Sequence, residues 1–281
     1  MSVGGETSGR LPLDPNFRLS AVPGALMGLV RHRELLWHMT VRHLRAQYKQ
    51  SILGYSWIAL NPLAQLLTLG FVFSTIFHSP SQGAPFLLFL ALGLMPWIFF
   101  QAAVQAGTDS LVGAESLVTS VYFPRETIVI AAVLVRVVDL IAGGAIIALL
   151  MLYFQYPLSW TVVWVPLILC IHAIFVIGIS LPFAAFNLFF RDIRFLVGVV
   201  LYLWFFFTPI MYSVDLVPER YSLLYDLNPN ARFIGAYRYA ILSHVSPPLT
   251  GLLVAILVSL GTLLVGYYLF KRMEPAFADR V

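Results

Sequence analysis

Six long apolar stretches constrain the fold of this chain more than any other feature of its sequence. A helix needs about 20 apolar residues to cross the ~30 Å hydrocarbon core of a bilayer, and all six stretches reach that range, the fifth only narrowly. Their apolar runs are continuous rather than alternating, which predicts helices and not the strands of a barrel. The stretches are Ile52–Phe77, Phe86–Gly107, Thr127–Phe154, Trp160–Phe190, Phe195–Tyr212 and Leu249–Phe270.

The composition excludes a soluble protein. Hydrophobic residues make up 60% of the 281 residues and charged residues 11%, whereas soluble domains are roughly half apolar and a quarter charged. Too few polar residues remain to cover six such helices in water. We therefore expect an all-α integral membrane protein with six transmembrane helices, whose function is to move something across the membrane.

The basic residues predict the orientation. Of the 17 lysines and arginines, thirteen fall on one side of the six predicted spans and three, Arg220, Arg232 and Arg238, fall on the other, with Arg136 inside a span. Basic residues favour the cytoplasmic side, so both termini are predicted to be cytoplasmic. Residues 1–20 lack the apolar core of a secretory signal.

Four regions follow from this pattern: a polar tail over 1–25, an amphipathic helix over 26–50, a transmembrane domain over 51–272 and a C-terminal tail over 273–281. The segment 26–50 is basic on one side, which predicts a helix lying in the cytoplasmic interface. That helix either anchors the first span or also docks a cytoplasmic partner; the pattern favours the anchor. Its predicted apolar face comprises Leu29, Leu36, Trp37, Met39 and Leu44.

Two connections between the spans have helical character of their own. The inner connection carries apolar residues at near-helical intervals over about 110–120, too few to span, and therefore needs a partner surface, either the membrane interface or another protein. The outer connection, about 213–242, contains two short amphipathic helices separated by Asn228, Pro229 and Asn230. These helices either dip into the outer leaflet and return or cap an opening from outside.

Catalytic and metal-binding patterns are missing from the sequence. A nucleotide P-loop needs a glycine-rich turn followed by lysine, and neither of the two lysines, Lys49 and Lys271, follows such a turn. The sequence has no HExxH motif, and its one cysteine, Cys170, is predicted to be a packing residue in the fourth span. We therefore expect no enzymatic activity, no ATP hydrolysis by this chain and no bound metal or cofactor.

Arg136 and Asp139 are the exception to the uncharged interior of the spans. Their spacing of three residues places them on adjacent turns of the third predicted span, where charges are costly and are paired or functional. Asp139 in isolation would suit a proton-coupled carrier. Because Arg136 supplies a partner, we favour a structural ion pair beside Gly143 and Gly144.

Three segments carry a resemblance to a known family. SILGYSWIALNPLAQLLTLGFVFSTIF at 51–77, LVGAESLVTSVYFPRE at 111–126 and RDIRFLVGVVLYLWFFFTPIMY at 191–212 resemble the permease subunit of bacterial ABC exporters for cell-surface polysaccharides. That group, of the ABC type-2 membrane-protein class, exports lipid-linked O-antigen, capsule and teichoic-acid polymers. The resemblance covers about residues 30–272 and preserves motif order.

The resemblance implies a homodimer in the bacterial inner membrane, paired with two separate ATPase subunits that hold ATP and Mg²⁺. The resemblance also implies that residues 26–50 form the interface helix and that residues 110–120 form a coupling helix, which binds in a groove on the ATPase. Residues implied in coupling are Leu111, Leu117, Val118, Tyr122, Phe123, Pro124, Arg125 and Glu126.

The resemblance also implies a channel between two copies, walled by their first and fifth spans, with 213–242 as an external gate. Aromatic rings suit such a channel because sugars pack their apolar faces on them, although aromatics near span ends also serve as interfacial anchors. Candidate channel residues are Tyr55, Trp57, Asn61, Tyr202, Trp204 and Tyr212, and candidate gate residues are Tyr221, Asn228, Pro229, Phe233 and Tyr237. Pro62, Pro96 and Pro209, inside predicted spans, each remove a helix hydrogen bond.

Other functions stay open at this stage. An ABC exporter of a drug or small lipid has the same expected fold. An ion-coupled carrier would depend on Asp139 and on an ion gradient rather than on an ATPase. A membrane enzyme acting on lipid-linked sugars would need a convergent acid and base, which the peripheral carboxylates do not supply.

Overall fold

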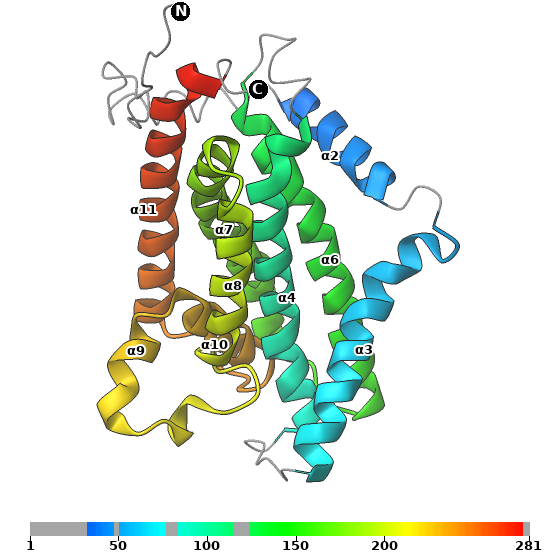
Figure 1. Cartoon of the computed structure of the whole chain (residues 1–281). Helices are drawn as coiled ribbons and strands as arrows, with labels where there is room; N and C mark the ends of the chain where they lie inside the picture. The colour runs from blue at the N-terminus through cyan, green and yellow to red at the C-terminus, as the bar shows by residue number, and fades with distance from the viewer. Residues whose placement is uncertain (1–32, 48–50, 77–83, 115–123, 278–281) are drawn as a thin grey trace, which may run out of the picture.

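A computed structural model of the chain describes residues 33–47, 51–76, 84–114 and 124–277. Every regular element within those ranges is helical, and the long helices stand side by side (Figure 1). The principal elements are α2 (Arg33–Gln47), α3 (Trp57–Phe71, extended by Val72–Ile76), α4 (Phe86–Ser110), α6 (Glu126–Tyr153), α7 (Trp164–Phe189), α8 (Ile193–Phe206), α9 (Ser222–Asp226), α10 (Pro229–Ile241) and α11 (Leu249–Met273). Short 3₁₀ turns precede α3, α7 and α9, and another, Glu274–Phe277, follows α11.

Five of the helical segments in the described part of the chain are long and apolar enough to cross a bilayer. They are Gly54–Ile76, Phe86–Ser110, Glu126–Tyr153, Trp160–Phe189 and Leu249–Phe277. They coincide with five of the six predicted spans. The integral-membrane, all-helical prediction therefore agrees with the structure.

The fifth predicted span is shorter than predicted. Helix α8 has 14 residues, about 21 Å at 1.5 Å per residue, against the ~30 Å of the hydrocarbon core. Its end at Phe206 has a local cause, because Pro209 disfavours helical geometry at Thr208. Residues 207–212 continue without regular helix, so six membrane crossings stay a prediction.

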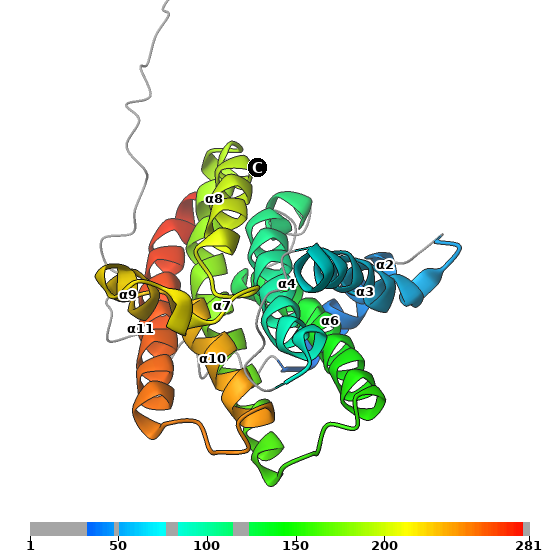
Figure 2. The same ribbon diagram turned by 90° about the horizontal axis from the view of Figure 1, so that it is seen from below.

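Helix α4 forms the centre of the bundle. It packs against α3, α6, α7, α8 and α10 and is buried along most of its length, and Figure 2 shows the other helices arranged around it. Lipid tails are as apolar as leucine, so helices of a membrane bundle expose apolar side chains outward. Accordingly, α3, α8 and α11 carry many exposed apolar residues.

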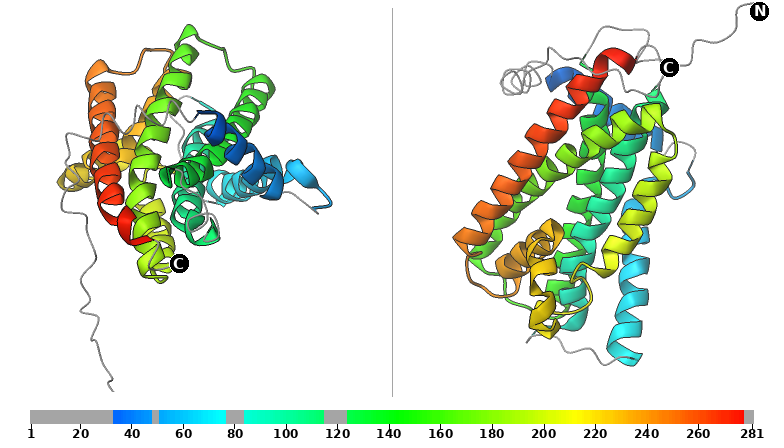
Figure 3. Two further views of the ribbon diagram at one scale, coloured as in Figure 1. Left: turned by 90° about the horizontal axis from the view of Figure 1, so that it is seen from above. Right: turned by 60° about the vertical axis from the view of Figure 1, so that its left-hand side comes forward.

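Helices α7 and α11 run side by side (Figure 3) and approach closely at two glycines. A Cβ atom added to Gly178 would lie 2.6 Å from the Leu263 nitrogen, and one added to Gly266 would meet the carbonyl oxygen of Gly178. Small residues let helix backbones approach in this way where lipid gives no hydrophobic drive for association. These glycines therefore fix the position of the last span.

The two ends of the bundle differ. Helix α2, the start of α6 and the end of α11 lie at one end, and α9 and α10 lie at the other (Figure 1). Helix α2 packs against α6 through the buried Met39 and Thr40. Trp37, predicted on the same broad apolar face, lies about 160° around the helix from Met39 and is 67% exposed, so α6 does not cover it and its place in the membrane interface stays a prediction.

Candidate functional site

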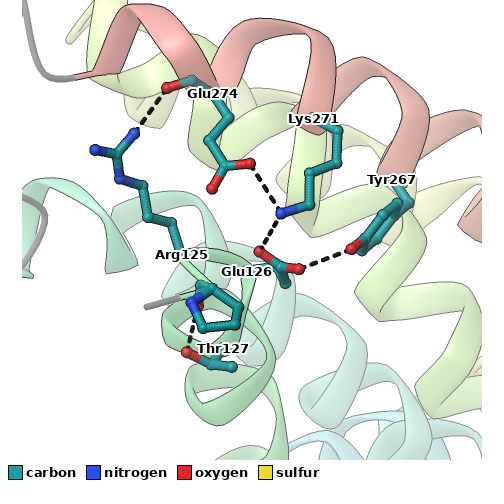
Figure 4. A network of polar contacts seen from close by, with 7 residues as sticks. Arg125, Glu126, Thr127, Tyr267, Lys271 and Glu274 are labelled. Atoms are coloured by element: carbon teal, nitrogen blue, oxygen red, sulfur yellow. Dashed lines mark hydrogen bonds and ion pairs between the residues drawn. The ribbon is translucent and has the colours of Figure 1, made fainter. Parts of the chain in front are cut away.

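A buried polar network joins the start of α6 to the end of α11 (Figure 4). Glu126, the first residue of α6, is only 2% exposed. Its carboxylate accepts hydrogen bonds from Lys271 Nζ at 2.8 Å and from the Tyr267 hydroxyl at 2.7 Å. Lys271 Nζ also lies 2.8 Å from the Glu274 carboxylate. A charged group so deeply buried is tolerated because it is paired and hydrogen-bonded.

Neighbouring residues add one contact between the same two helices and one within the start of α6. Arg125 donates from Nη1 to the backbone oxygen of Glu274 at 2.8 Å, and the Thr127 hydroxyl donates to the Pro124 oxygen at 2.6 Å. Arg125 and Glu126 thereby hold the start of α6 to the C-terminal end of α11. Sequence reasoning missed Tyr267 and Lys271 as partners of Glu126, and Glu274 as the second partner of Lys271.

The predicted coupling residues divide into two groups. Leu117, Val118, Tyr122 and Phe123 lie outside the described residues. Of the others, Leu111 is fully buried next to the end of α4, in an apolar cluster that includes Ile128 and Leu181. Leu111 and Glu126 therefore face the interior of this chain, where they position the two borders of the segment 115–123.

The predicted channel residues also divide. Tyr55, in the turn before α3, and Trp57 and Asn61, near the start of α3, are exposed. Tyr202 on α8 is 62% exposed. Helices α3 and α8 both flank α4 (Figure 2). Trp204 instead packs edge-on against Phe100 at 5.3 Å between ring centroids. Trp204 thus contributes to the core of this chain.

Asn228 connects the end of α8 to the start of α10. Its side-chain oxygen caps α10 by accepting from the Asn230 and Ala231 nitrogens, and it also accepts from Trp204 Nε1 at 3.0 Å. Its side-chain nitrogen donates to the Phe207 oxygen and to the Thr208 hydroxyl, both at 3.1 Å. Pro229 follows as the first residue of α10, a position where its missing N–H costs nothing.

Arg238 secures the irregular segment that follows α8. Its guanidinium donates to the backbone oxygens of Pro209 and Ile210, both at 2.7 Å, and lies 3.6 Å from the centre of the Phe89 ring. These donors satisfy carbonyls that a continuing helix would otherwise pair. Sequence reasoning counted Arg238 only as an outer-side charge.

The remaining predicted gate residues have different surroundings. Phe233 and Tyr237 are buried, and Phe233 stacks on His172 with 4.4 Å between ring centroids. The gate candidate Tyr221 is exposed, and the channel candidate Tyr212 shares a 2.7 Å hydrogen bond with Tyr225. Helix α10 is therefore seated in the core by its aromatic face.

The structure places Arg136 and Asp139 in contact, with Nη1 of the arginine donating to Oδ2 of the aspartate at 3.1 Å. No group of three or more His, Cys, Asp or Glu side chains that would suit a metal ion occurs within the described ranges. Cys170 is exposed, so its predicted role as a packing residue is wrong.

Comparisons with known proteins agree on one family. The ABC-2 type transporter family matches residues 34–242. The O-antigen export system permease protein RfbA of Myxococcus xanthus is 29% identical over 256 residues, which is 90% of this chain and 97% of that protein. An RfbA of Klebsiella pneumoniae is 32% identical over 251 residues, 88% of this chain and 94% of its own. The polysialic acid transport protein KpsM of Escherichia coli is 26% identical over 249 residues, 84% and 92% of the two chains.

Proposed function

The chain belongs to the ABC-2 type transporter family, and we propose that it is the permease subunit of an exporter for a lipid-linked cell-surface polysaccharide in the bacterial inner membrane. The polymer is of O-antigen, capsular or teichoic-acid type. The observation that carries this proposal is the similarity to O-antigen export permeases over nearly the whole length of both chains. The family implies an ABC ATPase as partner.

The chain supplies the membrane path, and its partner supplies the energy. Its two lysines do not form a nucleotide site, so ATP and Mg²⁺ are held by two ATPase subunits. The distribution of basic residues supports an orientation with both termini on the cytoplasmic side. The segment about 110–120 is then the coupling helix, on the same side of the membrane as α2.

Two copies of the chain form the channel. In a single copy, α3 and α8 expose apolar and aromatic side chains, among them Trp57 and Tyr202. We assign these surfaces to the contact between copies and to the channel wall. Rings such as these offer flat apolar faces to sugars while the hydroxyl groups stay hydrated.

Nucleotide binding drives the transport cycle by favouring one arrangement of the two copies. An equilibrium shifts only when the ligand binds its two states unequally, here the open and closed ATPase pair. Movement of the coupling helix reaches α11 through the contacts of Arg125 and Glu126. The lipid-anchored polymer enters the opened channel from the inner leaflet.

Purification of the tagged chain in mild detergent, with mass spectrometry of the co-purified proteins, tests the first part of this proposal. We expect a stoichiometric ATPase subunit. The complex, reconstituted in vesicles, should export native lipid-linked glycan only with ATP and not when the ATPase carries a substitution of its nucleotide-binding lysine. Transport that follows a proton gradient without any ATPase would refute the proposal and favour an ion-coupled carrier.

Two substitutions test the channel assignment in the same vesicles. Trp57→Ala and Tyr202→Ala should slow glycan export while ATPase association is retained. Trp160→Ala serves as the matched control, because Trp160 is also largely exposed but lies in the turn before α7. Equal effects of all three substitutions would refute the assignment of α3 and α8 to the channel wall.

A further inference from the structure

A cavity of about 310 Å³, lined by both polar and apolar residues, lies between α3, α4 and α6. Its lining includes Trp57 and Asn61 from α3 and the pair Arg136 and Asp139 from α6. A second cavity, of about 410 Å³, shares Arg136 and also Gln47 with the first and extends along α2 and α4. The side chains of Arg136 and Asp139 are 24% and 14% exposed. The ion pair is therefore a contact within α6 that also borders an accessible cavity.

The pair is incompletely satisfied by the described part of the chain. Arg136 Nε and Asp139 Oδ1 are buried there without a hydrogen-bond partner. An ion pair retained only for packing is expected to be fully hydrogen-bonded, because each orphaned polar atom carries its full desolvation cost. Both side chains border the cavity, so the incompletely paired groups adjoin a space that a ligand can enter.

Pro62 interrupts the helical hydrogen bonds in the part of α3 that borders the cavity. Proline has no N–H, so the carbonyl of Ile58, four residues earlier in α3, loses its helical donor. Ile58 and Pro62 both line the cavity. The cavity lining thus includes a carboxylate, a guanidinium and an amide among apolar side chains.

The charges of the lining indicate the chemical class of the ligand. In the first cavity Arg136 is balanced by Asp139, and the second cavity adds the carboxylate of Asp109 and the imidazole of His43. Without an excess of positive charge, a phosphate group is disfavoured. A hydroxyl group both donates and accepts, and so fits the guanidinium and the carboxylate together.

We propose that this cavity binds one sugar residue of the exported polymer, with its hydroxyls on Arg136, Asp139 and Asn61 and one apolar face on the Trp57 ring. This inference rests on the proposed function and deepens it. Arg136 lies about 15 Å along α6 from its cytoplasmic end, within the inner half of the bilayer. The site would therefore hold sugar that has left the cytoplasm and has not yet reached the outer gate.

Protection of an engineered cysteine tests the proposal directly. Cys170→Ala removes the chain's only cysteine, and Asn61→Cys then places a thiol at the cavity; the complex with its ATPase is held in nanodiscs. Modification of Cys by N-ethylmaleimide is followed by mass spectrometry with native lipid-linked glycan, with polyprenyl phosphate lacking sugar, or with neither. Glycan at about ten times its dissociation constant should slow modification about tenfold, and polyprenyl phosphate should not.

Matched variants separate binding from general effects. Arg45→Cys, in the same Cys170→Ala background, reports an exposed position on α2 that does not line either cavity, and its modification should be unaffected by glycan. In the Asn61→Cys chain, Trp57→Phe should keep most of the protection and Trp57→Leu should lose it, because only the former retains an aromatic face.

Each remaining outcome overturns a specific part of the inference. Equal protection by polyprenyl phosphate would make this a phosphate site and not a sugar site. Absence of protection, with glycan still stimulating ATP hydrolysis, would refute the site while the proposed function stands. Absence of both protection and stimulation would refute the proposed function, and the sugar site with it.

Discussion

Replacing Lys271 by methionine tests whether the network around Glu126 holds the start of α6 to the end of α11. Within the described chain, the substitution leaves the Glu126 carboxylate with only the Tyr267 hydroxyl as side-chain donor. The Glu126 side chain is 3% exposed, so water does not compensate for the loss. Removing one partner of a buried ion pair costs about 3–5 kcal/mol. Because Glu126 begins α6, the helix dipole offsets a part of this cost, on the order of 0.5 kcal/mol.

A matched substitution in the same network should cost far less. Glu274→Gln removes one of the two carboxylates at Lys271, but the bond from Lys271 to Glu126 persists. The Glu274 side chain is 21% exposed, and a partly solvated ion pair contributes about 1 kcal/mol or less. The bond from Arg125 reaches the backbone oxygen of Glu274 and is unaffected by this change.

The double variant Glu126→Gln with Lys271→Met distinguishes a lost contact from an uncompensated charge. Glutamine still accepts the hydrogen bond from Tyr267, and no buried carboxylate is left unpaired. The double variant should therefore be more stable than Lys271→Met alone, by about 2 kcal/mol or more.

The assay is reversible unfolding of the purified chain in mixed detergent micelles, which gives a free energy of unfolding for each variant. We expect Lys271→Met to be the least stable, the double variant intermediate and Glu274→Gln nearest the unaltered chain. Equal losses for Lys271→Met and Glu274→Gln, or additive losses in the double variant, would refute the reasoning.

Three further predictions concern other contacts. Gly266→Ala should destabilise the chain by about 1–3 kcal/mol in the same unfolding assay, because its Cβ meets the α7 backbone. The control Gly261→Ala, with nothing within 4 Å of the added Cβ, should be neutral or stabilising. Equal effects of the two substitutions would contradict the close approach of α7 and α11. Asn228→Ala should lower the free energy of unfolding by about 2–4 kcal/mol, because it removes a helix cap and buried hydrogen bonds. Asn228→Asp keeps the acceptor and should lower it less. The reverse order would contradict the capping role of Asn228. Burial, and then the charge of Arg42, lowers the pKa of His43 below 6.5, so the unfolded chain takes up this proton first and stability falls as the pH drops through about 6.5. His43→Gln should therefore lose less stability than the unaltered chain between about pH 7.5 and pH 5.5, and parallel curves would contradict this.

The lengths of the apolar stretches predicted most of the architecture, because long continuous apolar stretches in a membrane form helices that satisfy their own backbone hydrogen bonds. The predicted stretch Phe86–Gly107 became a helix that ends only three residues later, at Ser110. The stretch Phe195–Tyr212 was harder to predict: hydropathy alone extends it through Pro209, whereas backbone geometry ends α8 at Phe206.

The contacts that hold the candidate site together were less accessible to sequence reasoning. Glu126 and Lys271 are 145 residues apart in the chain, and no local spacing relates them. Arg136 and Asp139, by contrast, are separated by one helical turn, so their contact followed from periodicity. The cavity beside that pair depends on how α3 leans against α4 and α6, which the sequence pattern does not specify.

Because α4 lies inside the bundle, a substitution on α4 should lower stability more than a similar substitution on an outer helix. A substitution on α4 alters a volume that neighbouring helices enclose on several sides, so compensating changes are needed in other helices. A substitution on the exposed face of α11 meets lipid, which adjusts to any apolar shape. Sequence divergence among chains of this kind is therefore expected to be fastest on the outside of the bundle and slowest in α4.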